Sequence, residues 1–134
     1  MDYARLSDLY ARFGEREINQ IADIDRTGTA DAVLVDRALS DAAAEIDAAL
    51  LGRYALPVAT VPDLLRRIAC DLARYFLYAD QPGKEVEARA KNAREMLLWI
   101  ANGKLKLDLP PPGKEAPNAD ARIDFGRSRM EWPT

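Results

Sequence analysis

The sequence predicts an all-α protein: a small helical bundle of two short N-terminal helices and three longer helices, followed by an extended C-terminal arm. Two observations support this class. Apolar residues recur at intervals of three and four over most of the first 103 residues. Beyond that point the periodicity stops and the run PPPG breaks regular structure. We therefore expect a bundle domain over residues 1–103 and an arm, which need not be fully ordered, over residues 104–134.

Two short helices are expected at the N-terminus. In LSDLYARFG, Ser7 and Asp8 can cap a first helix that ends at Gly14. A second helix follows in EREINQIAD, where Ile18 and Ile21 lie on one side. The polar run DIDRTGTAD that comes next predicts a turn.

Three longer helices are expected over residues 30–51, 63–80 and 84–102. The apolar stripe of the first consists of Val35, Leu39, Ala42, Ile46 and Ala49. Pro62 lies where the first turn of the second helix tolerates proline. The apolar face of the third consists of Val86, Ala90, Ala93, Leu97 and Ile100. Gly103 follows this helix at the position of a C-terminal cap.

The connection GRYALPVATVP, residues 52–62, is longer and more apolar than a helix-to-helix loop requires. Pro57 and Pro62 restrict the residues before them to extended conformations and fix the chain direction. We therefore expect a rigid elbow whose apolar side chains pack on the ends of two helices. Packing explains Arg53 least among these residues. Replacing Arg53 by alanine should then impair assembly without unfolding the bundle.

The composition removes most catalytic chemistry. The 134 residues include no histidine and one cysteine, which excludes imidazole-based catalytic systems and an internal disulfide and leaves few ligands for zinc or iron. The carboxylates mostly alternate with Lys and Arg, as on a solvated surface. The charged N-terminus does not resemble a signal peptide, and no apolar run is long enough to cross a membrane. We therefore expect a soluble, cytoplasmic, non-enzymatic protein without cofactor or small-molecule substrate.

The segment DIDRTGTADAVL resembles an EF-hand calcium loop. Its candidate ligands are Asp23, Asp25, Thr27 and Asp31. The twelfth position, where a bidentate glutamate closes such a site, is Leu34. The same Asp, Thr and Gly residues would serve a loop that only caps the next helix. We expect the capping loop and keep a calcium site as the alternative.

The helix over residues 63–80 has apolar residues on two sides. The broader face holds Leu65, Ile68, Leu72, Tyr75, Phe76 and Ala79. The opposite side holds Cys70, Ala73 and Leu77, flanked by Arg66, Arg67 and Arg74. Because a small bundle rarely needs a fully central helix, we expect this second side to contact another subunit. Arginines can lower a thiol pKa, but a small buried residue is the more common role of a free cysteine.

A cluster of arginines raises the possibility of DNA binding. It consists of Arg53, Arg66, Arg67 and Arg74. The same helix carries Asp63, Asp71 and Asp80. Since the net charge of the chain is -3, we expect ion pairs within or between subunits and no direct DNA binding. A small helical DNA-binding or regulatory protein is the alternative function.

The predicted arm combines a strand-like alternation with sparse apolar residues. KLKLDL alternates as a strand does, and the later part is polar except for four residues. These are Ile123, Phe125, Met130 and Trp132. A segment meant only for solvation needs none of them. They are candidate anchors on a partner, and the alternative is that they fold back on their own bundle.

The order of these segments resembles a known family. The series LSDLYARFGEREINQIAD, an Asp/Gly turn, and VDRALSDAAAEIDAALLGRYALPVATVPDLLRRIACDLARYFLY is similar to small helical proteins of Mu-like prophages, encoded among virion structural genes. The most specific signature is the run Arg53, Tyr54, Leu56, Pro57, Val61 and Pro62, followed by Ile68, Ala69, Asp71, Ala73 and Tyr75. The resemblance covers about residues 1–103 and, more weakly, an Arg-rich tail such as RSRMEW.

This family is similar in outline to the head-tail connector, or head-completion, adaptors of tailed phages. The resemblance implies a helical subunit that assembles as a ring at the portal vertex, with itself, the portal and tail-completion proteins as partners. It implies the host cytoplasm during assembly and the virion neck afterwards. It also implies that Arg53 and Tyr54 present a polar edge to a neighbouring subunit. The resemblance further implies that the arm reaches a neighbour, so truncation after Gly103 should leave the bundle folded but unable to assemble.

Overall fold

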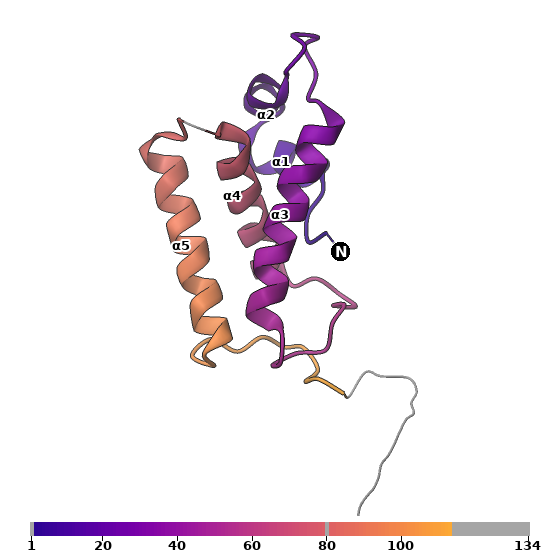
Figure 1. The fold of residues 1–134 in the computed structure, drawn as a ribbon, viewed down its shortest axis with the longest axis vertical. Helices are drawn as coiled ribbons and strands as arrows, with labels where there is room; N and C mark the ends of the chain where they lie inside the picture. Colours follow the sequence, from indigo (N-terminus) through magenta and orange to yellow (C-terminus); the bar gives the residue numbers. More distant parts are fainter. Residues whose placement is uncertain (1, 80, 114–134) are drawn as a thin grey trace, which may run out of the picture.

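The computed structural model describes residues 2–79 and 81–113, and this part of the chain contains helices but no strand (Figure 1). The helices are α1 (Leu6–Phe13), α2 (Glu15–Ala22), α3 (Ala32–Leu50), α4 (Asp63–Tyr78) and α5 (Gly83–Ala101). The all-α class and the division into two short and three longer helices are thereby confirmed. Residues 104–109 alternate in the sequence as a strand does, but the structure shows an irregular segment there.

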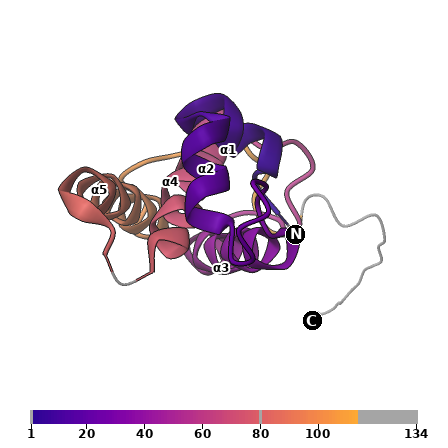
Figure 2. The same ribbon diagram turned by 90° about the horizontal axis from the view of Figure 1, so that it is seen from above.

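The long helices form an up-and-down arrangement with α4 in the middle. α4 runs opposite to α3 and to α5 and packs against both (Figure 1). Seen from above, α5 lies on one side of α4, while α1, α2 and α3 lie on the other sides (Figure 2). The carboxyl ends of α3 and α5 therefore lie at the same end of the molecule, here called the basal end. The turn of residues 23–31 lies at the opposite, apical end.

Local capping residues set the helix boundaries. α1 begins after Arg5, whose N–H donates to Asp8 Oδ2 at 2.8 Å, so Ser7 is inside the helix and not its cap. Gly14 ends α1 as predicted, with a φ of 92° that favours glycine. Asp31 caps α3 by accepting the N–H of Leu34 at 3.0 Å.

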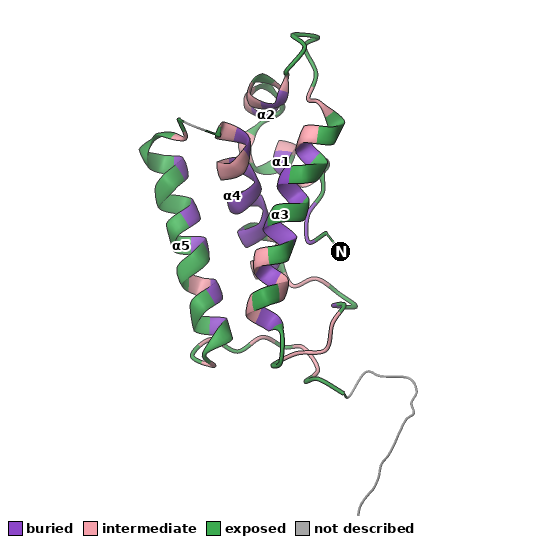
Figure 3. Ribbon diagram, in the orientation of Figure 1, coloured by how far each residue is buried: buried purple, intermediate pink, exposed green. Residues whose placement is uncertain are grey.

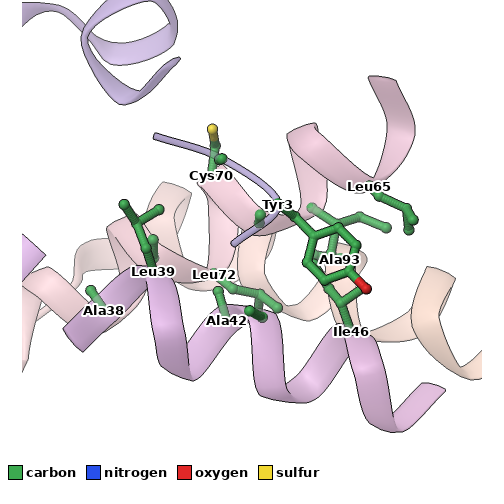
Figure 4. Packing of buried hydrophobic residues seen from close by; sticks show 14 of the residues in the cluster. Tyr3, Ala38, Leu39, Ala42, Ile46, Leu65, Cys70, Leu72 and Ala93 are labelled. Carbon is green, nitrogen blue, oxygen red and sulfur yellow. The ribbon is translucent and has the colours of Figure 1, made fainter. Parts of the chain in front are cut away.

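The centre of the core is α4, which is buried on almost every side (Figure 3). Its residues Ile68 and Leu72 have no exposed surface. Figure 4 shows Leu72 close to Leu39 and Ala42 of α3 and Tyr3 beside Ile46. The Tyr3 hydroxyl donates to Asp47, which fixes the N-terminal segment against α3.

The predicted subunit contact on the second side of α4 is wrong. Cys70 and Ala73 have no exposed surface, and Leu77 retains only 6%. The short helices α1 and α2 pack on α4 and cover this side, with Leu9, Ile18 and Ala22 as their buried residues. The prediction failed because the two N-terminal helices were not expected to supply a further layer, which makes α4 a fully central helix.

The bundle continues past Gly103. Leu105, Leu107 and Leu109 are partly buried and pack against the core. The carbonyl of Pro110 accepts the N–H of Ala55 at 2.9 Å, which joins this segment to the elbow. The first part of the predicted arm is therefore attached to the bundle at least as far as Pro110.

None of the helices within residues 2–79 and 81–113 combines the length and the apolar character needed to cross a membrane.

Candidate functional site

Arg74 is the centre of the strongest polar cluster in the described residues. Its Nε donates to Glu17 Oε2 of α2 at 2.7 Å, and its Nη2 donates to Glu85 Oε1 of α5 at 3.2 Å. Its guanidinium also lies 4.3 Å from the ring centre of Phe13. Burial opposes the charged form, but the hydrogen bonds to the two glutamates outweigh it and raise the pKa of Arg74. Arg74 was predicted at a partner interface, and the structure instead buries it as a link between three helices of one subunit.

The four clustered arginines lie in different surroundings. Arg66 Nη1 lies 2.8 Å from Asp63 Oδ1 on the same helix, as the predicted ion pairing requires. Arg53 lies at the basal end, where its Nε donates to the carbonyl oxygen of Ala101 at 2.6 Å. With Arg74 also paired, three of the four predicted arginines are engaged inside their own subunit.

Cys70 does not have the surroundings of a reactive thiol. It is fully buried beneath α1, and burial raises its pKa to about 12 despite the nearby charge of Arg12. A thiol with a raised pKa is a poor nucleophile, because the thiolate is the reactive form. The structure therefore favours the packing role for Cys70.

Asp71 is a buried carboxylate with a weak partner. Its side chain is 4% exposed, and Oδ1 lies 3.5 Å from Nη1 of Arg89 on α5 without a hydrogen bond within the described residues. Burial raises the pKa of Asp71, and Arg89 opposes that shift only partly. The Asp71 carboxylate therefore lies in the interior of the bundle, between α4 and α5.

The turn of residues 23–31 uses its acidic side chains to hold its own backbone. Asp23 accepts the N–H groups of Thr27 and Gly28, both at 2.8 Å, which lowers the pKa of Asp23. Asp31 is the cap of α3. Asp25 is exposed, and the described residues contain no group of three or more Asp, Glu, Cys or His side chains placed to hold a metal ion. The geometry is that of the capping loop.

The elbow and the segment after α5 join at the basal end. The Arg53 guanidinium also lies against Gly103, where an added Cβ would come within 3.0 Å of Arg53 Nη1. The Tyr54 hydroxyl accepts the N–H of Leu107 at 2.8 Å. Arg53 and Tyr54 were predicted to face a neighbour, and the structure gives both an intramolecular role that the sequence did not indicate.

A groove of about 430 Å³, here called the basal groove, lies between these two segments. It is lined by Ala55, Pro57, Val58, Ala59, Thr60, Pro62, Asp108, Leu109 and Pro110. Thr60 and Asp108 are the polar side chains of this set, and the other seven residues are apolar. The groove is therefore suited to an apolar group with a positive charge near its edge.

Exposed large apolar residues occur at both ends of the described molecule. Leu51 at the end of α3, and Leu98 and Trp99 near the end of α5, lie at the basal end with exposed fractions of 74%, 62% and 38%. Ile24 and Val33 lie at the apical end and are 64% and 67% exposed. Sequence reasoning missed these residues. Leu98 and Trp99 follow Leu97 in an apolar run, and their position beside a stripe of period three and four was the available signal.

The predicted anchors of the arm, Ile123, Phe125, Met130 and Trp132, lie outside the described residues.

Comparison with known proteins identifies relatives of the whole helical part. A model of the family described as Bacteriophage Mu, Gp36 matches residues 3–124. The chain is 35% identical over 107 residues to the Mu-like prophage FluMu protein gp36 of Haemophilus influenzae, covering 80% of this chain and 76% of that protein. It is 33% identical over 108 residues to Gene product J of Escherichia phage Mu, covering 78% and 74%. The resemblance to Mu-like prophage proteins is confirmed: the chain belongs to the Bacteriophage Mu Gp36 family.

Proposed function

We propose that this phage protein is a non-enzymatic structural adaptor of the virion neck, which joins head and tail by binding copies of itself, the portal and tail-completion proteins. The observation that carries the proposal is the basal end, where the large apolar residues Leu51, Leu98 and Trp99 are exposed. Single exposed apolar residues are ordinary on a monomer, but several at one end mark an interaction surface. In a Mu-like phage protein, the partners such a surface would meet are other particle proteins.

The pattern of exposed residues also fits assembly into a ring. A ring of identical subunits uses two different patches on each subunit, so that each copy contacts the next head to tail. The apical pair Ile24 and Val33 and the basal residues supply two such patches. Val33 and Leu51 are separated by eighteen residues of chain running along α3, or about 27 Å at the rise of an α-helix.

The arrangement of the charged residues within the described part supports the proposal of a non-enzymatic role. Asp23, Asp31 and Glu17 bind backbone or arginine groups, and Asp71 lies in the bundle interior. Basal groove residues other than Asp108 and Thr60 carry no polar side chain. The basal groove therefore holds no pair of acid and base side chains.

A pull-down from a cell with an induced prophage tests the proposal. Tagged wild-type protein should capture portal or tail-completion protein, and Leu98→Asp should reduce that capture at least tenfold because it places a charge in the basal surface. Ala88→Asp, at an exposed position of the same helix, is the matched control and should behave as the wild type. Capture that is equal for Leu98→Asp and the wild type would contradict a basal interface. Salt-dependent binding to duplex DNA would favour the regulatory alternative.

A further inference from the structure

The basal groove has a wall formed by the chain just before the described part ends. Pro110 lines the groove and is held there by the hydrogen bond from Ala55 to its carbonyl. Gly113, three residues later, is the last residue that the structure describes. A further 21 residues, 114–134, follow Gly113 in the sequence.

The surface of the groove is suited to an extended segment with an aromatic side chain. Pro57, Pro62 and Pro110 present ring faces on which an aromatic ring can pack, and proline rings against aromatic rings are a common basis of peptide recognition. Of residues 55–62, Ala55 is the one whose N–H donates to a backbone carbonyl elsewhere in the described chain. An extended segment lying along the elbow can therefore pair its own backbone with the remaining groups.

Two apolar pairs in the last 21 residues are spaced to enter one groove from an extended segment. Ile123 and Phe125 form one pair, and Met130 and Trp132 form the other, because residues two apart lie on the same side of an extended chain. The two pairs lie in segments of opposite net charge. Residues 120–125 hold two aspartates and one arginine, a net charge of -1, whereas residues 127–132 hold two arginines and one glutamate, a net charge of +1.

The charged lining residue of the groove is Asp108, which is exposed. Its negative charge repels residues 120–125, which carry a net negative charge, and attracts residues 127–132, which carry a net positive charge. The charge of the groove therefore favours residues 127–132 as its occupant. Tryptophan and arginine are also the residues that most often dominate binding surfaces.

The length of the intervening chain allows docking within one molecule. Trp132 is 19 residues beyond Gly113, and a flexible chain of that length has an end-to-end distance of about 24 Å. A connection of this kind gives an effective concentration of the order of millimolar, above that of any second copy in dilute solution. We propose that the basal groove is the docking site of the chain's own C-terminal segment, with Met130 and Trp132 in the groove and Arg129 beside Asp108.

Fluorescence of Trp132 tests the proposal on the full chain. The protein has two tryptophans, so Trp99→Phe leaves Trp132 as the sole reporter. Docking should make acrylamide quenching of Trp132 at least threefold weaker in the native protein than in urea. Equal quenching in both conditions would overturn the proposal.

Groove variants in the same background locate the contact. Ala59→Arg fills the groove at an exposed position and should restore strong quenching, whereas Ala88→Arg, exposed on α5 away from the groove, should leave quenching weak. Circular dichroism and the urea midpoint show that both variants are folded. Weak quenching that persists in Ala59→Arg would show that Trp132 docks elsewhere and would overturn the assignment.

A charge exchange tests the proposed pair. Asp108→Arg should strengthen quenching, and Asp108→Arg combined with Arg129→Asp should return it toward the starting value. A double variant no better protected than Asp108→Arg would contradict the contact between Arg129 and Asp108. Protection that develops only as protein concentration rises would identify a second copy's segment as the occupant and overturn docking within one molecule.

Discussion

At the scale of single residues, Arg74 carries the most polar interactions of the described core. It ties α2 to α4 through Glu17 and α4 to α5 through Glu85. The two glutamates differ in exposure, at 28% for Glu17 and 63% for Glu85. A pair that is shielded from water contributes more than an exposed pair, because solvent and salt screen the exposed one.

We therefore expect Glu17→Ala to destabilise the fold more than Glu85→Ala. The Glu17 variant also removes the acceptor of the Tyr78 hydroxyl, so we expect a loss of about 2 kcal/mol, within the range for a broken hydrogen bond to a charged group. Urea unfolding of the two variants measures the difference. Equal losses would mean that the geometry of Glu17 gives it no advantage over the exposed glutamate.

Because Asp71 is buried, we expect its contribution to stability to fall as pH rises. An ordinary ion-paired carboxylate has the opposite effect. Burial raises its pKa in the folded state, so the folded state binds a proton more tightly than the unfolded state does. Stability from Asp71 is fully present below the ordinary aspartate pKa and is lost as pH rises through the raised value. The stability of the wild type relative to Asp71→Asn should therefore be lower at pH 7 than at pH 3.

Urea midpoints of wild type and Asp71→Asn at both pH values measure this effect. Asp36→Asn, which removes an exposed carboxylate from α3, controls for the general change in net charge. If the wild type gained stability relative to Asp71→Asn on going from pH 3 to pH 7, the ion pair with Arg89 would outweigh the cost of burial.

At the scale of elements, the segment that follows α5 behaves as part of the bundle. Its three leucines pack on the core, and Tyr54 and Ala55 hold it by hydrogen bonds. The elbow is consequently held between the end of α3 and this segment. Its prolines and apolar residues were interpretable from the sequence as a rigid, packed connection. The partner that it packs against was not, because the contact joins residues about fifty positions apart.

Truncation distinguishes the two parts of the predicted arm. Ending the chain after Gly103 should cost about 3 kcal/mol, because three partly buried leucines are each worth about 1 kcal/mol. The truncated bundle is still expected to fold, as predicted from the sequence, but with reduced stability. Ending the chain after Gly113 keeps all three leucines and should change the unfolding free energy of the bundle by much less. Thermal and urea unfolding of both truncations provide the measurement, and equal stability of the two would contradict the packing role of residues 104–110.

At the scale of the whole molecule, the two exposed apolar ends predict how subunits pair. If the apical end of one copy contacts the basal end of the next, Val33→Asp and Leu98→Asp each remove one half of every contact. Neither variant alone should self-associate. An equimolar mixture retains one intact apical and one intact basal surface and should form pairs but no larger species.

Analytical ultracentrifugation at concentrations where the wild type assembles measures this outcome. Complete assembly of either single variant would show that its residue lies outside the contact. Absence of pairs in the mixture would contradict head-to-tail contact and favour an interface made by the same surface on both copies.

The sequence by itself determined the helices, their approximate bounds and the family. Those properties depend on residues close together in the chain: period-three and period-four apolar stripes, Gly14 and Gly103 at helix ends, Asp31 as a cap, and a long ordered run of matching segments. Only the tertiary structure decided which surfaces are free. Cys70, Ala73 and Arg74 looked like an outward side of α4 because a single helix does not reveal how many neighbours cover it. Arg53 and the basal groove depend on α3, α5 and the segment after α5 meeting at one end, which is a property of packing between distant segments.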